Sequence, residues 1–103
     1  MRIPGLFFAV VVTFAGVQPA AQGAEPNAGR SIAASCANCH GTNGVSAGAT
    51  ASLAGQPQRD LVAKMRDFKS GARAGTIMPQ LAKGYTDEQI ELAAAWFAAQ
   101  PAK

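Results

Sequence analysis

The sequence predicts a small all-α domain, with about three main helices joined by long loops. Apolar residues recur at helical spacing in separate segments of the chain. Gly, Pro, Ser and Asn punctuate the stretches between those segments, and no alternating apolar run predicts a strand. A length of 103 residues leaves room for one domain.

The composition excludes several classes of protein. With 49% hydrophobic and 15% charged residues, the chain is too apolar for a disordered acidic tail. Its net charge of +3 is too small to predict a nucleic-acid partner. Beyond the first 17 residues, the only aromatic side chains are Phe68, Tyr85, Trp96 and Phe97. Another group must therefore help to fill the core.

The first 23 residues have the order of a secretory signal peptide. A basic start is followed by an apolar run from Leu6 to Val17 and then by small residues up to Gly23. The run is shorter than the roughly 17–25 residues of a membrane-spanning helix, so no stable membrane span is expected. Cleavage after Gly23 would leave residues 24–103 as a single mature domain in the periplasm.

The first predicted helix lies directly before a cysteine motif. Asn27 is a suitable capping residue, and the helix is expected to run through Ile32 into Cys36. Residues 41–55 are mostly small or polar and predict an irregular loop about fifteen residues long. A loop of that kind is expected where the chain wraps around another group.

The second predicted helix begins at Pro57, a residue suited to the first helical position, and ends at Gly71. Its apolar stripe consists of Leu61, Met65 and Phe68. Residues 72–84 predict a second loop. Because Pro79 disfavours helical geometry at the residue before it, Met78 is expected within that loop.

The third predicted helix has a strong start signal. Thr86 and Gln89 have the spacing of a capping box, and Tyr85 and Ile90 that of a hydrophobic staple. The helix is expected to run to about Ala99, before a proline ends it.

The segment Cys36-Ala37-Asn38-Cys39-His40 has the spacing typical of covalent haem c attachment. Cys36 and Cys39 lie about one helical turn apart, so they can form thioethers with two vinyl groups of one haem. His40 then becomes the proximal ligand of the iron. A large apolar haem also accounts for the missing core.

The different-class alternative is a periplasmic thiol-disulfide or metal-binding module. Thiol-disulfide oxidoreductases share the Cys-x-x-Cys spacing but would be expected within a βαβ pattern, which this sequence lacks. A structural zinc site normally has four ligands, and His40 is the only histidine. A structural disulfide between the cysteines is the third alternative.

Two methionines of the mature chain could bind the distal side of the haem iron. Met65 belongs to an apolar helical stripe, where methionine usually packs in the core. Met78 lies beside a stiffening proline, so we expect Met78 to be the ligand and keep Met65 as the alternative. With both axial positions filled, the domain transfers single electrons and is not an enzyme by itself.

Four segments resemble small class I cytochromes c, most closely the cytochrome c4/c553 group. The resemblance covers residues 27–100 and implies that group's fold, with loops around one haem and the first and last helices crossing near Gly29 and either Trp96 or Phe97. The segments are Cys36-Ala37-Asn38-Cys39-His40-Gly41, Leu53-Ala54-Gly55-Gln56-Pro57, Ile77-Met78-Pro79 and Thr86-Asp87-Glu88-Gln89-Ile90.

Within that group, the sequence is similar to haem subunits of flavocytochrome c sulfide dehydrogenases. This similarity implies a flavoprotein partner that carries FAD, and a downstream acceptor such as another cytochrome. Alanine occupies 19 of the 80 residues from 24 to 103. A surface of small residues with little charge suits a lasting protein partner. The alternative is a freestanding soluble shuttle between respiratory complexes.

The charged residues of the second helix predict a solvated face rather than a docking site. Asp60 and Asp67 interrupt its basic residues, and Asp60 has helix-pair spacing to Lys64. The sequence does not decide whether the haem propionates bond to Arg30, Tyr85, Gln56 or none of these residues.

The mature protein is expected to have the mass of residues 24–103 plus one covalent haem. Intact-mass measurement of the natively exported protein checks this expectation. A mass that retains residues 1–23 would contradict the cleavage.

Overall fold

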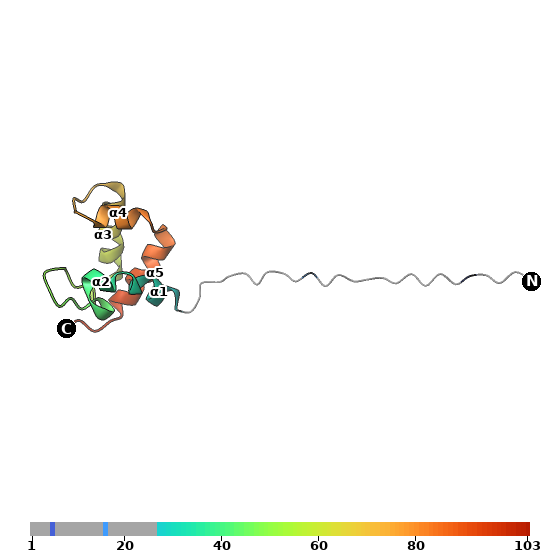
Figure 1. The fold of residues 1–103 in the computed structure, drawn as a ribbon, viewed down its shortest axis with the longest axis horizontal. Coiled ribbons are helices and arrows are strands. Elements are labelled where there is room, and N and C mark those ends of the chain that lie inside the picture. The colour runs from blue at the N-terminus through green and yellow to red at the C-terminus, as the bar shows by residue number, and fades with distance from the viewer. Residues whose placement is uncertain (1–4, 6–15, 17–26) are drawn as a thin grey trace, which may run out of the picture.

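Five α-helices and one short 3-10 helix form the part of the chain that the computed structural model describes, residues 27–103 with Gly5 and Gly16 (Figure 1). The elements are α1 (Ala28–Ala34), α2 (Ala37–His40), η1 (Thr42–Gly44), α3 (Gln58–Ser70), α4 (Met78–Lys83) and α5 (Asp87–Ala98). The predicted all-α class is confirmed, because α1, α3 and α5 are the main helices and these residues contain no strand.

The predicted signal peptide, residues 1–23, lies outside the described residues apart from Gly5 and Gly16. Within the part of the chain that is described, no helix has the length and apolar character needed to span a membrane.

Helix α1 packs across α5 at Gly29 (Figure 1). A Cβ atom on Gly29 would lie 2.5 Å from the Leu92 carbonyl oxygen and 3.4 Å from Trp96 Cβ. Glycine therefore lets the two helix backbones approach more closely than any side chain would allow. The expected crossing near Gly29 and Trp96 is confirmed.

The buried core is built mostly from small and medium side chains of α1, α3 and α5. Met65, predicted to pack in the core, is partly buried against this cluster. No large side chain within residues 27–103 is less than 2% exposed. The core cluster consists of Ala33, Leu61, Val62, Ile90, Ala94 and Phe97.

The predicted start of α5 is confirmed in detail. The Gln89 backbone N–H donates to Thr86 Oγ1 at 3.1 Å, and the Thr86 backbone N–H donates to Gln89 Oε1 at 2.9 Å. These reciprocal bonds form the capping box and satisfy two donors at the helix start.

The ends of the other helices agree less closely with the sequence. Gly71 follows α3 in the left-handed conformation, as expected, but Pro57 caps that helix and Gln58 begins it. Asn27 precedes α1, yet its side chain makes no capping hydrogen bond. The carbonyl of Asn27 instead accepts from the Ser31 N–H at 2.9 Å.

The first helix does not continue into Cys36 as predicted. It ends at Ala34, and the Ser35 and Cys36 N–H groups donate to carbonyls three residues earlier, at 3.2 and 3.0 Å. The Ser35 hydroxyl also donates to the Ile32 carbonyl at 2.7 Å. The Ser35 side chain thus competes with backbone N–H groups for the Ile32 carbonyl at the point where the α-helix ends.

The prediction that Met78 lies in a loop is wrong. Met78 is the first residue of α4, and Pro79 occupies the first turn, where its missing N–H removes no helical hydrogen bond. The Ile77 carbonyl accepts from two N–H groups of α4, and Ala82 is fully buried at 0% exposure. Burial of Ala82 supplies the tertiary contact that stabilises this short helix.

We expect Gly29→Ala to destabilise the fold by about 1–3 kcal/mol, the usual cost of overpacking. The clash with the Leu92 carbonyl must outweigh the gain in helix propensity, which is about 1 kcal/mol. Gly48→Ala is the matched control, because a Cβ there meets no atom within 4 Å. Equal unfolding free energies for the two variants, from denaturant titration, would contradict the close helix contact.

Candidate functional site

Cys36, Cys39 and His40 are brought together by one short helix. Cys36 caps α2, and the His40 N–H donates to the Cys36 carbonyl at 2.9 Å, which closes a single helical turn. Cys36 is half-buried, Cys39 is exposed and both thiols are free. Two thiols one turn apart and an adjacent imidazole are the groups that covalent haem attachment requires.

The His40 ring is oriented by a backbone carbonyl. Its Nδ1 atom lies 2.6 Å from the Ala51 oxygen. Because a carbonyl only accepts hydrogen bonds, Nδ1 carries the hydrogen and donates it. Nε2 then keeps its lone pair, and such a second contact is typical of histidines that bind metals. The donor set therefore fits an iron ligand.

The segment after His40 turns sharply at Gly41. Gly41 has a φ angle of +84°, and a side chain there would collide with the Val45 carbonyl. Gly44 accepts from the N–H groups of Leu53 at 2.8 Å and Ala54 at 3.1 Å. These bonds return the chain toward His40 and bring Ala51 to its ring.

Burial raises the pKa of the Cys36 thiol, and a weak hydrogen-bond contact with Ser35 lowers it by less. A thiol-disulfide oxidoreductase needs the opposite change, since the thiolate is its nucleophile. Within residues 27–103, no group of three or more His, Cys, Asp or Glu side chains could hold a metal ion. A raised thiol pKa at Cys36 does not favour thiol exchange.

Met78 lies on α4, a separate helix that packs against α3. Met78 is half-buried, while Ile77 and Leu81 beside it are 53% and 45% exposed. They are the exposed large apolar side chains of the described residues. Exposed apolar side chains close to a methionine in the sequence fit the approach of an apolar group such as a macrocycle.

The residues left open as propionate partners already have other neighbours. Gln56 donates to the Ser52 carbonyl at 2.5 Å and accepts from Lys64 Nζ at 2.8 Å. The Tyr85 hydroxyl lies 2.7 Å from Ser35 Oγ. This contact joins residues 50 positions apart, and no periodicity in the sequence could have revealed it.

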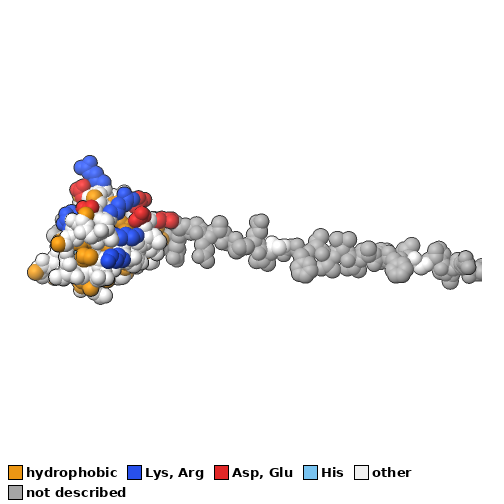
Figure 2. Space-filling view, turned by 90° about the horizontal axis from the view of Figure 1, so that it is seen from above, with side chains coloured by type: hydrophobic (Ala, Val, Ile, Leu, Met, Phe, Trp, Pro, Cys, Tyr) orange, Lys and Arg blue, Asp and Glu red, His pale blue; other side chains and the backbone are white. Residues whose placement is uncertain are grey.

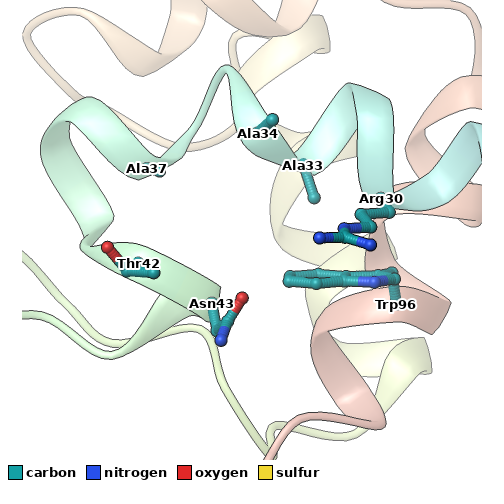
Figure 3. Close-up of a pocket in the computed structure, with 7 residues that line it drawn as sticks. All are labelled: Arg30, Ala33, Ala34, Ala37, Thr42, Asn43 and Trp96. Atoms are coloured by element: carbon teal, nitrogen blue, oxygen red, sulfur yellow. The ribbon is translucent and has the colours of Figure 1, made fainter.

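Arg30 lies over the ring of Trp96 at a cavity of about 200 Å³ (Figure 3). The cavity is formed by residues of α1, α2, η1 and α5, including Ala33 and Asn43. Its lining includes Arg30, one of the residues left open as a propionate partner, and Ala37 of the cysteine motif, but not Cys36, Cys39, His40 or Met78.

The charged side chains of α3 are exposed or half-buried, and several of them form ion pairs within the chain. Arg59 contacts Asp60 at 3.4 Å, and Arg66 contacts Glu91 at 3.1 Å. The expected Asp60–Lys64 pair is not formed, because Lys64 donates to Gln56 instead. Figure 2 shows basic and acidic side chains interspersed on one face of the domain. The solvated face stays a prediction.

The comparisons with known proteins agree with this geometry. The family model described as Cytochrome c matches residues 26–99. The chain is 39% identical over 80 residues to the cytochrome subunit of sulfide dehydrogenase of Chlorobaculum tepidum, covering 78% of this chain and 73% of that protein.

Two other relatives are matched over a smaller share of their length. Identity to cytochrome c4 of Pseudomonas aeruginosa is 39% over 74 residues, covering 71% of this chain and 37% of that protein. Identity to the thiosulfate dehydrogenase electron acceptor of Stutzerimonas stutzeri is 38% over 72 residues, covering 68% of this chain and 33% of that protein. The chain thus spans about a third of these two proteins.

The fold, the cysteine motif and these matches define the class of electron carriers that bind haem c covalently. The chain belongs to the cytochrome c family. The resemblance to class I cytochromes c, the helical fold class and the electron-transfer function predicted from the sequence are confirmed. The protein is an electron carrier and not a catalyst by itself.

Proposed function

We propose that the protein is the electron-accepting haem subunit of a sulfide-oxidising flavoprotein complex. The observation that carries this proposal is the length match to the cytochrome subunit of sulfide dehydrogenase, which covers 78% of this chain and 73% of that protein. The match to cytochrome c4 covers only 37% of that relative.

The residues that would hold one haem are Cys36 and Cys39 through thioether bonds, with His40 and Met78 as the axial iron ligands. The hydrogen bond from His40 Nδ1 to Ala51 supports the proximal assignment, since it leaves Nε2 available. The exposed apolar neighbours of Met78 support the distal assignment. Met65 is the weaker candidate because it packs against the core.

Bound haem supplies one-electron redox chemistry, and the protein's residues set its conditions. His40 and Met78 together would fill both axial positions, which excludes a substrate from the iron, and methionine ligation favours a high reduction potential. Ile77 and Leu81 would limit access of water beside Met78. The proposed FAD belongs to the partner subunit, which must deliver its two electrons one at a time.

The charge distribution supports a lasting partner over a diffusing shuttle. Residues 24–103 carry 8 basic and 6 acidic side chains, a formal charge of +2. Several of these charges are paired within the domain. Weak long-range steering is the result, whereas rapid transient docking generally relies on complementary charge.

Export is also part of the proposal. Residues 1–23 would direct the chain to the periplasm and be removed, so that residues 24–103 act there. The final acceptor would be a further cytochrome.

Met78→Leu is expected to abolish the weak absorption near the red end of the ferric spectrum that reports iron–sulfur ligation, and to lower the reduction potential. Leucine keeps the volume of methionine, so the fold should lose less than about 1.5 kcal/mol. Met65→Leu is the matched control and should keep the band. The reverse pattern in spectra of the two variants would assign the ligand to Met65.

Affinity isolation of the protein from native extract is expected to recover a stoichiometric flavoprotein. The isolated complex should contain FAD, and sulfide should reduce the haem within it. A lone monomer that no flavoprotein reduces would contradict the subunit role and favour the soluble shuttle.

A further inference from the structure

Tyr85 joins three parts of the domain. Its hydroxyl lies 2.7 Å from Ser35 Oγ, and its backbone carbonyl accepts from Lys69 Nζ at 2.6 Å. The ring is partly buried against the core cluster. Ser35 directly precedes Cys36, Lys69 lies in the last turn of α3, and Tyr85 itself follows α4 after one glycine.

The hydrogen bonds around Ser35 have a defined direction. Ser35 Oγ donates its one hydrogen to the Ile32 carbonyl at 2.7 Å. The Tyr85 hydroxyl must therefore donate to Ser35 Oγ. Removal of the tyrosine hydroxyl would leave Ser35 bonded to Ile32, so the change would break this contact without leaving the serine donor unpaired.

Helix α4 packs against α3 and is fully buried at Ala82, near its C-terminal end. Within residues 27–103, no side-chain hydrogen bond or ion pair joins residues 77–83 to another element. Ala82 is fully buried near the end of the helix, whereas Ile77 at its start is 53% exposed. Lys69 also contacts Asp87 at 3.5 Å, which reinforces the junction between α4 and α5.

We propose that Tyr85 is a positioning residue for the distal iron ligand. Ser35 is adjacent to the attachment residue Cys36, and Tyr85 follows, after one glycine, the short helix that begins at Met78. The contact between them fixes the distance from the attachment point to that segment, and thereby keeps the Met78 sulfur on the iron. This inference rests on the proposed assignment of Met78.

The test uses the haem-loaded protein with Tyr85→Phe, which keeps the packed ring and removes the hydroxyl. The pH midpoint at which the ferric iron–sulfur band disappears is expected to fall by about 0.4–1 unit, the equivalent of one net hydrogen bond. The affinity for added imidazole, which competes for the distal position, should rise about three- to tenfold by the same reasoning.

Ser35→Ala removes the same contact from the other side and should shift both measurements similarly. The double variant should show little further change, because the two side chains act through one interaction. Ser70→Ala is the control: its hydroxyl bonds the Asp67 carbonyl at 3.3 Å at the end of α3, away from this contact. It should leave both measurements unchanged.

The outcomes separate this inference from the proposed function. An unchanged midpoint and imidazole affinity in Tyr85→Phe, with or without a lower melting temperature, would overturn the positioning role. If Tyr85→Phe fails to fold, Ser35→Ala decides in the same way. A wild-type protein that lacks the iron–sulfur band would instead overturn the assignment of Met78.

Discussion

The close contact between α1 and α5 at Gly29 is the interaction on which the haem-binding segment depends. Helix α1 leads within two residues of its end to Cys36, so its position on α5 fixes where the cysteine motif begins. Helix α5 also holds the far end of this segment, because the Phe97 carbonyl accepts from the Gly55 N–H at 3.0 Å. One helix thus anchors both ends of residues 36–55.

The limited core gives the cofactor a structural role as well as a redox role. Burial of one medium or large apolar side chain contributes roughly 1.5–3 kcal/mol, and the core cluster contains six residues, two of them alanines. A covalently attached macrocycle would add apolar area that the chain itself lacks. Under the proposed attachment, haem would therefore contribute to the stability of the fold as well as to electron transfer.

The sequence predicted correctly several features that neighbouring residues determine. It did not predict features that depend on contacts between distant parts of the chain. The Thr86–Gln89 capping box and the left-handed Gly71 are set by neighbours within a few residues. Pro79 is compatible with two predictions. Proline disfavours helical geometry at the residue before it, but it is also common at the first positions of a helix. The burial of Ala82 against α3 decides between these effects, and that contact is tertiary.

The same distinction between local and distant contacts applies to the candidate site. Cys36, Cys39 and His40 were predictable because five consecutive residues contain all three groups. The Ala51 carbonyl that orients His40 and the hydroxyl contact between Ser35 and Tyr85 were not predictable, because sequence spacing carries no information about either. The first of these contacts leaves His40 Nε2 free to bind a metal, and the second ties the residue that follows α4 and Gly84 to the residue before Cys36.

The two proposed axial ligands therefore depend on interactions of different range. His40 shares a helical turn with Cys36, and covalent attachment would hold the haem beside it whatever the rest of the chain does. Under the proposed ligation, Met78 would reach the iron only through the packing of α4 on α3 and the contacts at Tyr85. Local opening of a protein occurs first where buried contacts are few. In the proposed arrangement, the rigidity of α4 would control both the ligation of the iron by Met78 and the reduction potential, because one-electron transfer depends on a ligand set that does not change between oxidation states.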